Sequence, residues 1–339
     1  MRRKDTLNYS EEVYPGIYRI TLPLPGDRPG PVNAYLFIGE NITLLDTGTA
    51  RTVRNLKTAF NGFPFKFTDI DQIIITHGHI DHYGAADHIV KKSGNSVLVV
   101  AHREDVQRIE TGMEVSRKVV LDFYRLIGIP DIHIRSWQLM NTAINAMADN
   151  CRVDTVLADG DTIQMGDYMG KVISTPGHSK GSICIFIENK GILFSGDHII
   201  GHITPNAFVM LEEDEKLPVR LSQTEFYESL SKIEALKPTL VYPAHGKTIT
   251  DLDMVARFYR SCFFERRDKI LSILDSGEKN VYKIARKLFP EISGPRLPLD
   301  IYLAVSEVYT HIQTLESENK VHLNIRNDTL EITRVDTEN

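Results

Sequence analysis

The first part of the chain alternates between strand-like and helix-like patterns of apolar residues. Between residues 16 and 48, the runs "GIYRITLPL", "NAYLFIG" and "NITLLDTG" are rich in β-branched and aromatic residues, and each predicts a strand. Residues 52–60 have a helical pattern, "DQIIITH" is typical of a buried strand, "YGAADHIVKKSG" predicts a helix, and "SVLVVAH" predicts a further strand. This alternation indicates an α/β domain.

The stretch from about residue 102 to residue 150 departs from that alternation. Its apolar residues recur at helical spacing, which predicts a helical insertion between strands. The segments "TVLADGDTIQMG", "MGKVISTPG" and "GSICIFIENKGILFSGD" then predict strands that are connected by hairpin turns. A helix over 222–236 and a strand in "TLVYPAHG" complete this domain, to which we assign residues 1–251.

Residues 252–339 have a different character. An apolar stripe that begins at Val255 predicts a long helix, two more helices are expected near 280–289 and 298–318, and "VHLNIRNDTLEITRV" predicts a hairpin. Three helices and a hairpin suggest a C-terminal winged-helix domain, a type that often binds DNA. From residue 256 onwards, however, 13 Lys and Arg balance 13 Asp and Glu. This neutral balance is a poor match for a phosphate backbone, so a packing or dimerisation role is favoured.

Composition narrows the class of protein. The chain has 339 residues, 42% of them hydrophobic, which is enough to bury a sizeable core, and a net charge of -6. That charge argues against nucleic acid as the default partner without excluding it. The thiols of Cys151, Cys184 and Cys262 are too widely spaced for a disulfide framework or a C-x-x-C metal site. We see no secretory signal and no membrane-spanning run, and therefore expect a cytoplasmic protein without a membrane partner.

The clearest chemical signal is the segment "THGHIDH", directly after the strand "DQIII". It places His77, His79, Asp81 and His82 in one turn at the end of a strand. Imidazole suits zinc or iron, and a carboxylate adds a hard oxygen ligand. The cluster therefore predicts a metal site.

Three more polar residues follow apolar strands. His178 lies in "STPGHSKGS", Asp197 in "LFSGDHI" and His245 in "LVYPAHG". Loops at strand ends are where α/β sheets build their sites. Each residue alone is a weak signal, but together and in this order they strengthen the metal-site prediction.

The order HxHxDH, His, Asp, His, together with the early "LLDTG", resembles the metallo-β-lactamase superfamily over roughly residues 14–250. The resemblance implies an αββα sandwich with a dinuclear site on one edge. Because position 79 is His and no cysteine belongs to the ligand set, the site is closer to the glyoxalase II, lactonase and RNase Z type. A C-terminal winged helix on this hydrolase fold resembles the branch that contains β-lactamase-like protein 2. The helical domain with which glyoxalase II holds glutathione is not recognisable here.

The resemblance also implies roles for the seven residues. His77, His79 and His178 would hold one divalent ion, Asp81, His82 and His245 a second, and Asp197 would bridge them. Zn²⁺ is the expected metal, with Fe or Mn as alternatives. Two such ions share a water, lower its pKa and supply a metal-bridging hydroxide. Asp81 would orient this nucleophile and take its proton.

Other residues are candidates for supporting roles. Asp46 of "LLDTG" could orient a ligand histidine, and His198 and His202 follow the expected bridging aspartate and could support the site or touch the substrate. Lys180 could meet an anionic group. Four side chains of the insertion could roof the site and admit an apolar group, or could serve packing alone: Phe123, Tyr124, Trp137 and Met140.

The sequence thus predicts a dinuclear metal-dependent hydrolase that acts on a small ester or thioester. A metal-dependent ribonuclease, a mononuclear iron enzyme of the persulfide dioxygenase kind, and a DNA-binding regulator with a sensory metal domain remain alternatives. We do not expect β-lactam hydrolysis, because no export signal is visible. The expected partner is a small-molecule substrate, and the winged helix leaves a homodimer open.

Overall fold

The computed structural model of the chain describes residues 10–26 and 28–335. Seven strands from the first half form one sheet in the order in which they occur in the chain. The first four pair antiparallel, whereas β4 to β7 run parallel to one another. The strands of this sheet are β1 (Ser10–Tyr14), β2 (Ile17–Leu22), β3 (Val32–Ile38), β4 (Ile42–Leu45), β5 (Gln72–Ile75), β6 (Leu98–His102) and β7 (Thr155–Leu157).

A second sheet of five strands faces the first. Its strand order is β12-β11-β10-β9-β8, and only β11 and β12 pair in parallel. These strands are β8 (Thr162–Met165), β9 (Tyr168–Ser174), β10 (Ile183–Ile187), β11 (Ile192–Gly196) and β12 (Leu240–Pro243). Between the sheets, Tyr35 and Phe37 of β3 pack against Phe194 of β11, with each pair of ring centroids 5.0 Å apart.

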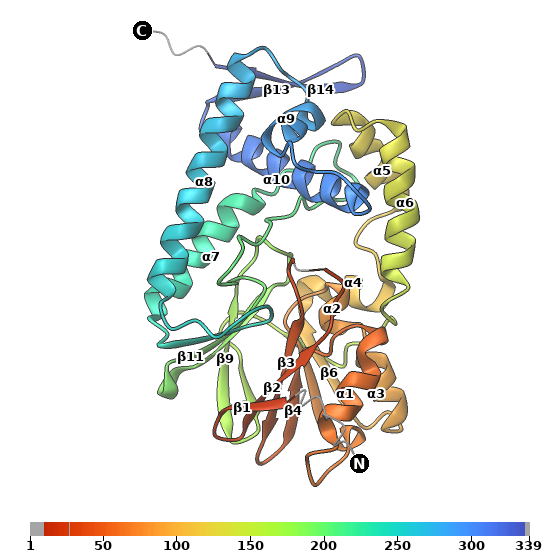
Figure 1. Cartoon of the computed structure of the whole chain (residues 1–339), viewed down its shortest axis with the longest axis vertical. Helices are drawn as coiled ribbons and strands as arrows, with labels where there is room; N and C mark the ends of the chain where they lie inside the picture. Colours follow the sequence, from red (N-terminus) through yellow and green to blue (C-terminus); the bar gives the residue numbers. More distant parts are fainter. Residues whose placement is uncertain (1–9, 27, 336–339) are drawn as a thin grey trace, which may run out of the picture.

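Helices cover the outer face of each sheet (Figure 1). Helices α1 (Val53–Phe60) and α3 (Ala86–Lys92) pack on the seven-stranded sheet. Helices α7 (Ser222–Leu236) and α8 (Leu252–Asp275) pack on the five-stranded sheet. This arrangement is the predicted αββα sandwich.

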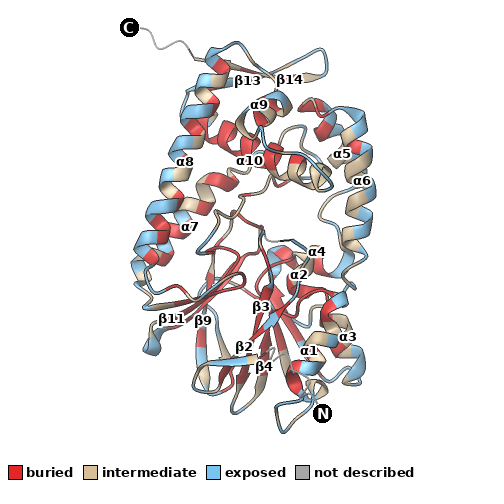
Figure 2. Cartoon of the chain, in the orientation of Figure 1, coloured by how far each residue is buried: buried red, intermediate tan, exposed pale blue. Residues whose placement is uncertain are grey.

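The unbroken apolar run of β5 reflects this layering. Ile73 and Ile75 point into the core under the outer helices, whereas Ile74 points into the core between the sheets. A parallel strand that is covered on both faces has no polar side, so its sequence does not alternate. Buried residues fill the two sheets, and a further buried group lies in the helical C-terminal part (Figure 2).

The predicted insertion is helical. It contains α4 (Val106–Thr111), α5 (Arg117–Leu126) and α6 (Asp131–Asn145), and the chain returns to the sheet at β7. The C-terminal part comprises the far end of α8, α9 (Val281–Leu288), α10 (Leu297–Ser317) and the antiparallel hairpin of β13 (Val321–Arg326) and β14 (Thr329–Arg334). These elements match the three helices and hairpin expected from the sequence. The winged-helix assignment and the boundary at residue 251 stay predictions.

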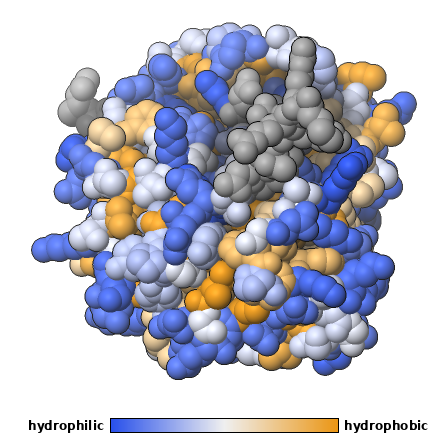
Figure 3. Space-filling model, turned by 60° about the horizontal axis from the view of Figure 1, so that its bottom comes forward, coloured by the Kyte–Doolittle hydropathy of each residue, from blue (hydrophilic) through white to orange (hydrophobic). Residues whose placement is uncertain are grey.

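The insertion and the C-terminal part share one hydrophobic core. Phe123 of α5 and Ile134 of α6 lie in the same cluster as Ile284 of α9 and Val308 of α10. In Figure 1, α8 runs along one side of the molecule and α5 and α6 along the other, with α10 between them. The view in Figure 3 shows the end of the molecule away from these helices, where hydrophilic side chains surround smaller hydrophobic groups. None of the helices that the described residues form combines the length and apolar character needed to span a membrane.

Candidate metal centre

The segment "THGHIDH" forms a tight turn at the carboxyl end of β5. His79 is the N-cap of α2 (Ile80–Tyr83), a single turn of helix that carries Asp81 and His82. The turn therefore brings His77, from the loop, and His82, from the helix, to the same place, with ring centroids 3.9 Å apart. Both rings are buried.

The second sheet supplies the remaining side chains. His178 follows β9, Asp197 directly follows β11, and His245 lies just beyond the end of β12. These strand ends meet the end of β5 at one edge of the sandwich. All seven side chains that the sequence singled out as ligands are thus brought together, in three overlapping groups that could each hold a metal ion.

One group consists of three imidazoles. His77 Nε2 lies 2.9 Å from His79 Nδ1, and that atom lies 3.1 Å from His178 Nε2. The three nitrogens converge as the ligands of a single cation would. His178 Nε2 also lies 3.5 Å from Asp197 Oδ2.

The other oxygen of Asp197 faces a second set. Asp197 Oδ1 is 3.6 Å from His82 Nε2 and 3.4 Å from His245 Nε2. Asp81 completes this set, with Oδ1 3.7 Å from His82 Nε2 and Oδ2 3.5 Å from His245 Nε2. Asp197 therefore lies between the two sets and presents one oxygen to each.

The donor atoms of this centre fit a cation. Among the residues that the structure describes, the buried atoms His82 Nε2, His245 Nε2 and Asp197 Oδ1 have no hydrogen-bond partner. Orphaned polar atoms are costly in a protein interior. Two imidazole nitrogens and a carboxylate oxygen that converge without partners are the donor types that bind zinc and related metals.

Hydrogen bonds on the far side of the rings fix their orientation. His82 Nδ1 lies 2.8 Å from Asp46 Oδ2, His178 Nδ1 lies 2.9 Å from the Asn206 carbonyl, and His245 Nδ1 lies 3.0 Å from the Pro31 carbonyl. An acceptor at Nδ1 keeps the proton there and leaves the lone pair of Nε2 directed at the cluster. Asp46 thus contacts a predicted ligand histidine, as its proposed role requires.

The electrostatics of the cluster favour neutral His77 and His79 and an ionised Asp197, as metal binding requires, but they favour a charged His82. Burial lowers the pKa of His77 and His79, because a charged imidazole would lose its hydration there. Burial alone would raise the pKa of Asp197, but the imidazoles of His245 and His82 hold that pKa well below its usual range. At His82, the three carboxylates nearby outweigh burial and raise the pKa, so they favour positive charge at that point.

Asp105 is a residue that the sequence analysis missed. Its buried carboxylate accepts hydrogen bonds from Gly78 N at 2.7 Å, Ser179 Oγ at 2.8 Å and Gly181 N at 2.9 Å. It thereby joins the "THGHIDH" turn to the loop that carries His178. A Cβ on Gly181 would lie 2.7 Å from Asp105 N, so the close approach requires glycine. The available signal was a single Asp after an apolar strand.

The remaining candidates lie around the cluster. His198 is fully buried, with its ring centroid 4.7 Å from that of Phe226. His202 is exposed, and its Nε2 lies 3.0 Å from the Pro29 carbonyl. Lys180 forms an ion pair with Glu212. The roles proposed for these residues stay predictions.

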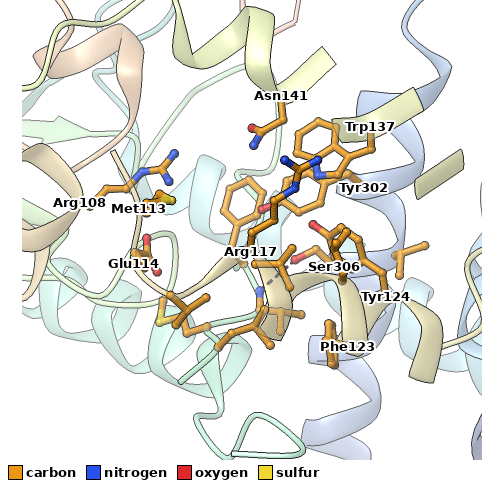
Figure 4. Close-up of a pocket in the computed structure, with 18 of the residues that line it drawn as sticks. Arg108, Met113, Glu114, Arg117, Phe123, Tyr124, Trp137, Asn141, Tyr302 and Ser306 are labelled. Carbon is orange, nitrogen blue, oxygen red and sulfur yellow. Dashed lines mark hydrogen bonds between the residues drawn. The ribbon is translucent and has the colours of Figure 1, made fainter. Parts of the chain in front are cut away.

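A cavity of about 370 Å³ opens beside the cluster. Figure 4 shows many of the side chains that line it. Its wall includes His79 and His178 at the cluster, and Phe123, Tyr124 and Trp137 from the insertion. Three of the four side chains that were expected to roof the site therefore line this cavity, whereas Met140 is not among its lining residues.

Proteins similar in sequence to this chain are named as a metallo-hydrolase, a β-lactamase-like protein and a thioesterase. A chain from Bacillus subtilis (strain 168) named "Probable metallo-hydrolase YqjP" is 24% identical over 312 residues, which cover 90% of this chain and 93% of that protein. The "Beta-lactamase-like protein 2 homolog" of Caenorhabditis elegans is 24% identical over 260 residues, or 75% of this chain and 70% of that protein. A shorter match joins 37% of this chain to 39% of the bovine (Bos taurus) "Acyl-coenzyme A thioesterase MBLAC2", at 29% identity over 124 residues.

A solved structure and a family profile also match this chain. The crystal structure of a metallo-beta-lactamase family protein from Thermus thermophilus superposes with a TM-score of 0.80 and 21% identity, covering 95% of this chain and all of that one. The profile of the Metallo-beta-lactamase superfamily matches residues 27–245. The chain therefore belongs to the metallo-beta-lactamase superfamily, as the order of its histidines and aspartates predicted.

Proposed function

We propose that the protein is a hydrolase of small esters or thioesters that uses two divalent cations, with Zn²⁺ as the expected metal. The observation that carries this proposal is the position of Asp197 between two sets of ligands. His77, His79 and His178 would hold one ion, and Asp81, His82 and His245 the other, with one Asp197 oxygen facing each set. Neighbouring cations in such a site activate water near neutral pH and stabilise negative charge on a reacting oxygen.

The residues of the chain have separate tasks in this scheme. Asp46, Asn206 and Pro31 hold the outer nitrogens of three histidines, so that the ligand set needs little rearrangement. Asp81 is the more exposed of the two inner carboxylates, with 19% of its side chain accessible against 8% for Asp197. We assign to Asp81 the orientation of the attacking water and acceptance of its proton.

The overall reaction adds water across an acyl bond. The water oxygen bonds to the carbonyl carbon, the bond from that carbon to sulfur or oxygen breaks, and the leaving thiol or alcohol gains a proton. A carboxylic acid is the second product. The name of the bovine relative, an acyl-coenzyme A thioesterase, supports a thioester as the first substrate to test.

The test is thioester hydrolysis by zinc-loaded protein over a panel of acyl-coenzyme A and acyl-glutathione substrates. Asp81→Asn should lower kcat/KM by about 10²–10⁴-fold, the usual contribution of a positioned acid or base. Asp87→Asn is the matched control, because Asp87 lies on the next helix and pairs with Lys91 instead. Its kcat/KM should stay near that of the unmodified protein.

The same assay tests metal dependence. Chelation should abolish turnover, and Zn²⁺, Mn²⁺ or Fe²⁺ should restore it to different extents. If metal-loaded protein hydrolyses no thioester, the thioesterase proposal is wrong. Lactones, RNA and oxygen-dependent sulfur chemistry would then be assayed in that order.

A further inference from the structure

We infer that the cavity beside the metal centre is an acyl-chain pocket whose size is set jointly by the insertion and by helix α10. This inference rests on the proposed function, since it names the substrate class of the same site. The acyl group would be apolar, with its carbonyl near His79 and His178 and its tail between α5 and α10.

The wall of the cavity is continuous from the metal centre to the C-terminal part. Phe208 has its ring centroid 5.3 Å from those of His79 and His178. It stacks on Tyr302 of α10 at 5.8 Å, and Tyr302 stacks on Trp137 of α6 at 4.4 Å with the rings only 9° from parallel. This aromatic wall leads from the reacting centre into the space between the insertion and α10.

The two ends of the cavity differ in polarity, and a further charged side chain, Arg117, is drawn between them beside Trp137 (Figure 4). Arg108 and Glu114 lie on one side of the close-up, and Phe123 and Tyr124 on the other (Figure 4). Among the described residues, neither Arg108 nor Glu114 has an oppositely charged group within 4.0 Å. A hydrocarbon tail would strip water from these charges without replacing it. The polar leaving group therefore belongs on their side.

The opposite side is built from side chains of the shared core. The apolar lining residues there are Val120, Phe123, Tyr124, Ile127, Ile129 and Val305. A tail placed among them loses contact with water and meets mostly carbon, which favours binding by about fourfold for each methylene. The volume of about 370 Å³ lies at the lower end of the range for small-ligand pockets, about 300–1,000 Å³, and so limits the tail to a moderate length.

The pocket cannot form from the catalytic sandwich alone. Val305 and Tyr302 belong to α10, about 60 residues beyond His245 in the chain, yet both line the cavity. Substitutions on this C-terminal helix should therefore change which substrate is used, although the helix supplies no candidate metal ligand.

Kinetics over a series of straight-chain thioesters, from acetyl- to dodecanoyl-coenzyme A, test this inference. For the unmodified protein, kcat/KM should rise by about fourfold per methylene until the cavity is full, and then fall. Val305→Phe should lower kcat/KM for the longer chains by about tenfold more than for acetyl-coenzyme A, because it removes room for about two methylenes. Val120→Phe, at a half-buried position on α5, should act in the same direction and serves if the α10 variant does not fold.

A binding measurement separates the pocket from the catalysis. Trp137 is the single tryptophan of the chain and lines the cavity, so its fluorescence reports occupancy. S-decyl-coenzyme A, a thioether that cannot be hydrolysed, should change this fluorescence saturably and bind more tightly than S-ethyl-coenzyme A. Leu139→Phe is the control, because Leu139 is 77% exposed on α6 and does not line the cavity.

The outcomes distinguish the two proposals. Chain-length-dependent binding without hydrolysis of any thioester would retain the pocket and overturn the proposed function. Hydrolysis with rates and binding that are independent of chain length would retain the function and overturn the pocket. Equal losses for all chain lengths in both Phe variants would also overturn it, because such losses indicate a structural effect only.

Discussion

Asp46 combines an uncommon backbone conformation with hydrogen bonds that orient a candidate metal ligand. Its φ of 60° lies in the left-handed region, which is uncommon for residues other than glycine. One carboxylate oxygen accepts from Thr76 N at 2.8 Å, and the other contacts both Thr76 Oγ1 and His82 Nδ1, each at 2.8 Å. The unusual backbone is therefore stabilised by the contacts that aim His82.

We predict that Asp46→Asn lowers zinc affinity by about 10–100-fold, as is typical when the partner of a ligand histidine is lost. Asn tolerates a positive φ and keeps the size of the side chain, so the fold should survive. Competition with a chromophoric chelator measures the affinity, and circular dichroism checks the fold. Unchanged zinc affinity in a folded variant would contradict the role assigned to Asp46.

Asp105 should be important for the geometry of the centre rather than for its charge. Asp105→Ala would leave the buried N–H groups of Gly78 and Gly181 without their acceptor. Each such loss costs about 1–3 kcal/mol, so we expect the free energy of unfolding to fall by about 2–6 kcal/mol. Urea denaturation measures it. A change below about 0.5 kcal/mol, the usual range for surface substitutions, would show that Asp105 is not needed for this loop contact.

The residue scale also shows which parts of the site a sequence can predict. The seven clustered side chains could be predicted because they repeat one signal, a polar ligand type after an apolar strand, in a fixed order. Asp105 has the same placement after β6 but no partner pattern in the sequence. Its role depends on the close approach of two glycines that are far away in the chain, which no local pattern encodes.

At the scale of elements, periodicity predicted the helices and strands but not their neighbours. The apolar stripes of α5, α6 and α10 are visible in the sequence; those of α5 and α10 are buried in the structure, whereas on α6 Ile134 is buried and Trp137 is half-buried. An apolar stripe indicates which face of a helix is buried, but it does not indicate which other element covers that face. The sequence therefore left open whether the insertion packs on the sandwich or elsewhere, and the structure places it against the C-terminal part.

Helices α8 and α10 enclose a buried polar group that should make stability depend on pH. Arg266 of α8 pairs with Glu307 of α10 at 2.9 Å, and one turn further the His311 ring is fully buried. Burial, reinforced by the charges of Arg266 and Arg267, lowers the pKa of His311 to about 3. Within the described residues, neither ring nitrogen has a hydrogen-bond partner, and Glu307 Oε1 is 3.9 Å away.

The sign of the effect follows from linkage. The unfolded chain binds a proton at His311 below its ordinary pKa of about 6.5, whereas the folded chain does so only near 3. Stability should therefore fall as pH decreases from about 6.5 towards 3, by up to about 1.4 kcal/mol per pH unit. His311→Phe should reduce this slope, as measured by urea denaturation of chelated protein between pH 7 and pH 4.5. Parallel pH profiles for the two proteins would refute the assignment.

At the scale of the whole molecule, the chain is organised around two junctions. The metal centre lies where the edges of the two sheets meet, and the cavity lies where the insertion meets α10. Helix α8 connects the sandwich to the C-terminal part. Its residues Val255 and Tyr259 pack on the five-stranded sheet, and Ile270 and Leu274 belong to the core shared with α10. The sequence boundary at residue 251 falls at the start of this helix, where the composition changes.

The shared core leads to a prediction about that boundary. Removal of residues 252–339 would uncover Phe123, Tyr124 and Ile127, which are at most 7% exposed in the intact chain. It would also strip α8 from the outer face of the five-stranded sheet. Exposed apolar surface of this extent drives aggregation or a loosely packed state. We therefore expect a fragment of residues 1–251 to aggregate or to bind a hydrophobic dye, and to lose cooperative unfolding.

The control is the full chain after chelation, which lacks metal but retains the shared core and should unfold cooperatively. Comparing the two proteins separates loss of the cation from loss of the C-terminal part. A fragment that unfolds cooperatively and binds zinc as the full chain does would instead support a catalytic domain that is independent of the rest. Chain-length selectivity would still distinguish such a fragment from the full chain. The fragment would lack Tyr302 and Val305, which line the cavity, and should therefore hydrolyse long and short acyl chains at similar rates.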